Sequence, residues 1–149
     1  MDIELNVNKC DVMAEVSQRT NYSGAKMDGD EKAYDRISTV DEDEAELNRF
    51  WDECRAEVAQ AFIRLLKSEG MNGDHYKVVL NVSASFDNAL LPGMELGLFG
   101  YFVQGIVSRW YMYTNKSDVE MNSAKGAAIL EEVREKAFYK RLPTRPVYS

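Results

Sequence analysis

The chain has 149 residues, of which 45% are hydrophobic, and a formal net charge of −7 at neutral pH. This length predicts one compact domain with its own core, so we expect a single domain over residues 1–149. The acidic net charge disfavours a nucleic-acid binder, because neutralised phosphates supply most of that affinity. The start, Met1-Asp2-Ile3-Glu4, lacks the basic and apolar regions of a secretory signal. No apolar run is long enough to predict a membrane span.

The first elements are a short strand and a helix. Apolar and polar residues alternate over residues 2–7, which predicts a half-buried strand. Asn8 is then expected to cap a helix from Lys9 to about Arg19. No periodicity survives over residues 20–40, where glycines and polar residues predict a long surface loop.

An acidic helix, a turn and a second strand follow. Asp41 and Glu44 resemble a capping box, and Gly70 is expected to stop the helix. Its apolar stripe has helical spacing and consists of Leu47, Phe50, Trp51, Cys54, Val58, Phe62 and Leu65. Residues 72–74, Asn-Gly-Asp, predict a turn, and the alternation over residues 75–86 predicts the second strand.

The stretch at residues 101–116, YFVQGIVSRWYMYTNK, belongs to a helix that is apolar nearly all round, which is typical of a buried helix. Pro92 suits its first turn. A second capping box, Ser117 with Glu120, predicts a final helix to about Tyr139, antiparallel to the aromatic one because the link is short. The fold class expected is mainly α (α+β): an antiparallel bundle of about four helices with a small two-stranded β element.

Catalytic and metal-binding patterns are not evident in the sequence. His75 has no cysteine or histidine at ligand spacing, and Cys10 and Cys54 form no CxxC pair. Residues 28–39 start like a calcium loop, but Ala33 and Thr39 stand where glycine and glutamate are required. We therefore predict no enzyme, no cofactor and no metal. A close approach of His75 to either cysteine would favour the enzyme alternative.

Charge is divided unevenly along the chain. Residues 28–57 hold twelve acids and four bases, whereas residues 134–149 hold five bases and one acid. This division has two interpretations: solvated helix faces, or a self-complementary head-to-tail assembly. On the second interpretation residues 140–149 are a basic, proline-containing tail. The interface would consist of Asp41, Glu42, Asp43 and Glu44 with Arg134, Lys136, Tyr139, Lys140, Arg141, Arg145 and Tyr148.

Three stretches carry a family resemblance: DEDEAELNRFWDECRAEV, LFGYFVQGIVSRWYMYTNK and YKRLPTR. Their order and character resemble the small helical head–tail connector (neck adaptor) proteins of tailed bacteriophages and prophages. The resemblance implies rings of identical subunits between portal and tail, with itself and other phage structural proteins as partners, no membrane and no specific nucleic acid. It also implies a location in the host cytoplasm and then in the virion. The alternatives are a cellular helical adaptor or regulatory binding module, and a small enzyme.

Overall fold

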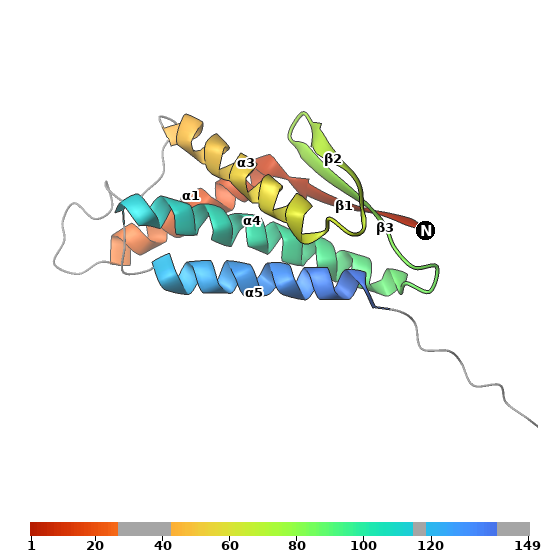
Figure 1. Cartoon of the computed structure of the whole chain (residues 1–149). Coiled ribbons are helices and arrows are strands. Elements are labelled where there is room, and N and C mark those ends of the chain that lie inside the picture. The colour runs from red at the N-terminus through yellow and green to blue at the C-terminus, as the bar shows by residue number, and fades with distance from the viewer. Residues whose placement is uncertain (27–42, 115–118, 140–149) are drawn as a thin grey trace, which may run out of the picture.

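The computed structural model describes residues 1–26, 43–114 and 119–139, which form four α-helices and one three-stranded sheet (Figure 1). The predicted mainly helical α+β class is therefore confirmed. The predicted two-stranded β element is wrong, because the described part of the chain contains a third strand. An antiparallel bundle of all the helices stays a prediction.

The sheet is antiparallel throughout and has the order β1-β3-β2. Its strands are β1 (Asp2–Asn8), β2 (Leu66–Asn72) and β3 (His75–Asn81). Leu5 on β1 lies opposite Val78 on β3, and both side chains are fully buried. The alternation in the sequence therefore identified the two strands that contribute most to the core, although the second ends earlier than predicted.

β2 is the strand that the sequence did not reveal. Its residues, LKSEGMN, have no regular alternation and include Gly70, which was expected to stop a helix. A register shift between Leu66 and Ser68 interrupts its pairing with β3. The turn to β3 is confirmed: Gly73 has φ of 63°, a conformation that costs glycine no steric clash.

α1 (Lys9–Lys26) follows β1 directly and is longer than predicted. Its cap is as expected, because the backbone N–H of Asp11 donates to Oδ1 of Asn8 at 3.2 Å. Residues 20–26, expected in a surface loop, continue the helix. The rest of that predicted loop, up to residue 40, lies outside the described residues.

α3 (Glu44–Ala61) buries the predicted apolar stripe, and it ends nine residues before Gly70. A turn follows in which the N–H of Leu65 donates to the carbonyl of Phe62 at 2.8 Å. The predicted capping box does not form as expected. Glu44 is the first helical residue instead of the third, Asp43 makes no side-chain cap bond, and Asp41 lies outside the described residues.

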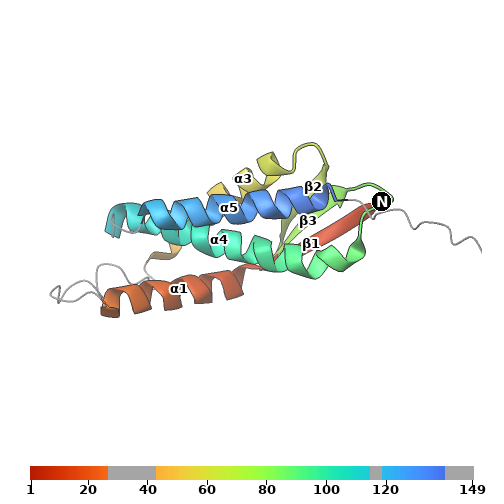
Figure 2. The same cartoon turned by 90° about the horizontal axis from the view of Figure 1, so that it is seen from below.

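α4 (Leu91–Thr114) is the central helix, preceded by a short 3₁₀ turn at Asn88–Leu90. α4 contacts α1, α3, α5 and β1. Figure 1 shows α3 and α5 on opposite sides of α4 and the sheet at its N-terminal half, and Figure 2 shows α1 on the side of α4 away from α5. This environment explains why the helix is apolar nearly all round. Phe102 is fully buried and stacks on Trp51 with 4.3 Å between ring centroids. Trp110, in contrast, is only half-buried.

The stretch Asn88–Met112 has the length and composition of a membrane span, with a mean hydropathy of 1.3. Half of the relevant window is buried inside the protein. A central helix of a globular core passes the same test, so one such helix is weak evidence for a span.

α5 (Val119–Ala137) runs antiparallel to α4, as predicted (Figure 1). Its buried residues are Gly126, Val133 and Ala137, whereas the apolar residues Ala124 and Ala128 are exposed. Ser117, the predicted cap, lies outside the described residues. The two helices pack closely because α4 has glycines at the contact.

Gly97 is the tightest of these contacts and gives a test of the α4–α5 packing. An added Cβ there would lie 2.6 Å from Cγ2 of Val133, whereas at Gly100 the nearest atom would be 3.9 Å away. We expect Gly97→Ala to destabilise the protein by about 1–3 kcal/mol through overpacking. Gly100→Ala is the control and should be neutral or stabilising by up to about 1 kcal/mol, from helix propensity. Equal unfolding free energies in urea would contradict the close packing.

Candidate functional site

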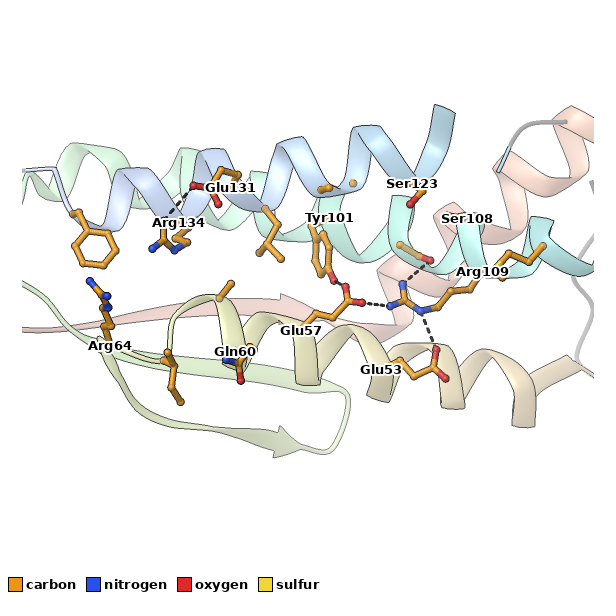
Figure 3. A pocket seen from close by; sticks show the side chains of 18 residues that line it. Glu53, Glu57, Gln60, Arg64, Tyr101, Ser108, Arg109, Ser123, Glu131 and Arg134 are labelled. Carbon is orange, nitrogen blue, oxygen red and sulfur yellow. Dashed lines mark hydrogen bonds and ion pairs between the residues drawn. The ribbon is translucent and has the colours of Figure 1, made fainter. Parts of the chain in front are cut away.

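A groove of about 660 Å³ opens between α3 and α5, with α4 as its floor (Figure 3). It exists because both helices pack on α4 but hardly on each other. The floor is formed by Tyr101, Gly105, Ser108, Arg109 and Met112. The two walls carry Glu53, Glu57, Gln60, Ala61, Ile63 and Arg64 on one side, and Ser123, Gly126, Ala127, Leu130, Glu131, Arg134 and Phe138 on the other.

Arg109 connects the floor of the groove to the α3 wall. Its Nε donates to Glu53 at 2.9 Å and its Nη2 to Glu57 at 2.6 Å. Nη1 donates to the backbone carbonyl of Gly105, one turn earlier, at 3.1 Å. The Arg109 side chain is only 19% exposed, so these bonds satisfy a charge that is largely removed from water. The cluster therefore fastens α4 to α3.

Two neighbours of Arg109 are held in their neutral forms. Burial raises the pKa of the Cys54 thiol to about 12, despite the opposing charge of Arg109. Burial also raises the pKa of the Tyr101 hydroxyl well above its usual range, and Glu57, which accepts the hydrogen bond from this hydroxyl, adds to the shift. A neutral thiol and a neutral phenol are poor nucleophiles and poor bases.

The groove therefore has the chemistry of a binding surface. Its charged groups other than Arg64 are held in ion pairs, and the potential nucleophile Cys54 is fully buried. Among residues 1–26, 43–114 and 119–139 there is no group of three or more His, Cys, Asp and Glu residues that could hold a metal ion. Between the charged side chains, the walls of the groove expose apolar surface that a partner could contact.

The second cysteine has a histidine nearby in the fold but a carboxylate as its partner. Register places Asn8 of β1 opposite His75, and Cys10 follows two residues later. The Cys10 thiol hydrogen-bonds to Asp74, whose carboxylate raises the pKa of that thiol. A catalytic cysteine requires a lowered thiol pKa, so the environment of Cys10 disfavours it as a nucleophile.

The predicted interface residues lie outside the groove or outside the described residues, with one exception. Arg134 lines the groove wall and pairs with Glu131 at 3.2 Å. Lys136 pairs with Glu132 at 3.6 Å, and Tyr139 is exposed. The described residues do not include Asp41, Glu42, Lys140, Arg141, Arg145 and Tyr148.

Among the described residues, the structure does not bring the acidic and basic members of this predicted interface together within one chain. Asp43 and Glu44 stand at the beginning of α3, at one end of the molecule. Arg134 and Lys136 stand in the last turn of α5, at the opposite end (Figure 1). Contact between these four residues therefore requires a second copy.

The groove and its Arg109 cluster were missed by the sequence reasoning, although one signal was present. Arg109 is the single charged residue in the aromatic stretch 101–115. A charged side chain on a largely buried helix requires a partner of opposite charge, so Arg109 was a signal that an acidic residue lies beside this helix. The periodicity could not show that this neighbour is the Glu53–Glu57 edge of α3.

Comparisons with protein families, curated proteins and solved structures found no match for this chain.

Removal of the Arg109 charge tests its role as the α3–α4 link. We expect Arg109→Gln to lower the free energy of unfolding by about 1–3 kcal/mol, because hydrogen bonds to charged groups are lost and two carboxylates remain adjacent. The control is Arg49→Gln, which removes an exposed pair with Glu46 and should cost below about 1 kcal/mol. The unfolding free energies of both variants are measured by urea denaturation. Similar losses in the two variants would contradict the link.

Thiol titration tests the environments of the two cysteines. At pH 8 in the native protein, a disulfide reagent should modify Cys10, which is exposed, and leave Cys54 unmodified until the protein is denatured. Asp74→Asn removes the charge that raises the Cys10 pKa, so more thiolate forms and the rate should increase. Asp11→Asn, a lesser contributor, is the control and should increase it less. An unchanged rate in Asp74→Asn would be contrary to this assignment.

Proposed function

We propose that the protein is a structural subunit of a tailed bacteriophage or prophage, of the head–tail connector type. It acts by ring-type self-assembly and by contacts with other phage structural proteins, without catalysis and without a cofactor. Its helices form an antiparallel bundle that presents complementary ends to neighbouring subunits. The protein would be made in the host cytoplasm and then incorporated in the virion.

The placement of charge at the two ends of the molecule carries this proposal. The acidic beginning of α3 and the last turn of α5, which leads to the basic tail, lie at opposite ends (Figure 1). Two complementary patches in this arrangement pair head-to-tail, and such an interface either closes into a ring or continues as a filament. A ring matches the architecture that the family resemblance implies.

The electrostatic contribution to assembly is modest. An exposed ion pair stabilises by about 0–1 kcal/mol, so the charges orient the subunits while apolar contacts hold them. Several large apolar side chains are exposed and available for such contacts: Ile63, Leu96, Met112, Met121, Phe138 and Tyr139.

A cellular adaptor or regulatory binding module is the second candidate, because the groove between α3 and α5 suits protein binding in either setting. Gene neighbourhood separates the two proposals. Portal, capsid and tail genes beside this gene would support the connector, and their absence from its genomic setting would support the adaptor.

Neutralisation of the tail tests head-to-tail assembly. We expect the full chain to self-associate at rising concentration. Replacement of Lys140, Arg141 and Arg145 by Gln should weaken that association about tenfold, equivalent to about 1.4 kcal/mol. The control replaces three cations elsewhere, Arg19, Lys77 and Lys125, and produces the same change in net charge.

Sedimentation velocity and native mass spectrometry at two salt concentrations measure these equilibria. The control variant should associate like the unaltered chain. If the tail variant and the control associate equally and with the same salt dependence, the head-to-tail proposal is wrong.

A further inference from the structure

The groove exposes apolar side chains along its whole length. Three of the large hydrophobic residues that the described structure leaves exposed line it: Ile63 at 59%, Met112 at 55% and Phe138 at 44%. Leu130 of α5 and Tyr101 on the α4 floor add further apolar lining. Apolar surface of this kind, bordered by charges, is typical of a docking site.

The charges of the groove differ between its two ends (Figure 3). Glu53 and Glu57, which share the single cation Arg109, lie at the end where the acidic part of α3 begins. Arg64, Arg134 and Glu131 lie at the other end, where Arg134 pairs with Glu131 and also lies over the Phe138 ring. Within the described residues no ion pair involves Arg64, so the Phe138 end carries one positive charge without an ion-pair partner.

The chain leaves α5 at this positively charged end. α5 ends at Ala137, Phe138 lines the groove, and the segment 140–149, KRLPTRPVYS, follows directly after Tyr139. This segment begins with Lys140 and Arg141. Were it to fold back into its own groove, those cations would have to pass Arg64 and Arg134, and like charges at close range repel.

We propose that residues 140–149 of one copy bind in the groove between α3 and α5 of the next copy, entering at the Glu53 end. There the basic residues of the tail meet the acidic start of α3 and the two carboxylates of Glu53 and Glu57, which are neutralised only in part by the single cation Arg109. The apolar residues Leu142, Val147 and Tyr148 then lie against the open apolar strip. This inference rests on the proposed head-to-tail assembly and identifies the surface that receives the tail.

The dimensions of the two partners agree. Residues 123 to 138, which form the α5 wall, are fifteen helical steps apart, or about 22 Å at 1.5 Å per residue. Ten residues in extended conformation span at most about 33–36 Å. The tail is therefore long enough to bridge from its own subunit and still cover most of the groove. Its two prolines favour an extended conformation that loses little entropy on binding.

Two adjacent alanines on α5 provide a matched test. Ala127 lines the groove and Ala128 does not, although both are exposed on the same helix. A fluorescent peptide of residues 140–149 is titrated with the full chain, and its anisotropy gives the dissociation constant. Ala127→Trp should weaken binding at least tenfold by filling the groove, and Ala128→Trp should leave it unchanged.

A second matched pair tests the charge of the groove wall. Glu131 lines the groove, whereas Glu132 faces away from it, and each pairs with a cation on its own helix. Glu131→Lys should weaken peptide binding several-fold, and Glu132→Lys should not. The proposal is overturned if Ala127→Trp and Ala128→Trp bind the peptide equally, or if the unaltered chain does not bind it at millimolar concentration.

Isotope mixing shows which copy provides the tail. A photoreactive phenylalanine at position 148 is introduced into unlabelled chains, which are mixed with ¹⁵N-labelled chains before irradiation. Cross-links that join the unlabelled tail to labelled groove peptides support the proposal. Cross-links only within one chain, or only outside the groove, overturn it.

The failure of this inference can be distinguished from failure of the proposed function. If tail neutralisation abolishes self-association while Ala127→Trp leaves it unchanged, the tail binds a different surface and head-to-tail assembly stands. If tail neutralisation has no effect on self-association, the assembly proposal itself fails.

Discussion

The packing of three aromatic rings across the middle of the molecule is the contact on which the rest of the structure depends. Phe102 of α4 stacks on Trp51 of α3, and Tyr76 of β3 meets both rings edge-on, with centroids 6.0 Å and 5.4 Å away. All three residues are at most 1% exposed. Because they come from three different elements, one cluster fixes α3 and the sheet on the central helix, and large aromatic rings contribute most of the buried area in such a core.

The Arg109 cluster complements this core at the other half of α4. It joins α4 to α3 through ion pairs rather than apolar contacts. The groove is a consequence of how α4 is packed, because α3 and α5 each pack on α4 much more extensively than on each other.

Head-to-tail assembly and tail binding in the groove would use the same asymmetry of charge. The basic tail follows α5 at the end of the groove that carries Arg64, and the acidic beginning of α3 lies at the opposite end of the groove. In the proposed assembly, like charges would disfavour binding of the tail in its own groove, and opposite charges would favour its binding in the groove of a neighbouring copy.

The sequence alone determined the elements whose residues repeat with a clear period. The strand at residues 2–7, the apolar stripe of α3 and the buried character of α4 followed from periodicity, because one-sided burial leaves a regular apolar spacing. The turn at Gly73 also followed, since few residues other than glycine adopt its backbone conformation. These are local properties, and each can be recognised within a short window of residues.

Only the tertiary structure decided the features that depend on contacts between distant residues. β2 has little strand signal of its own and is a strand because β3 provides hydrogen-bond partners. The exposure of Ala124 and Ala128 on α5 was set by which neighbours lie beside that helix. The groove depended on the separation of α3 from α5, and no local pattern encodes a separation between two helices.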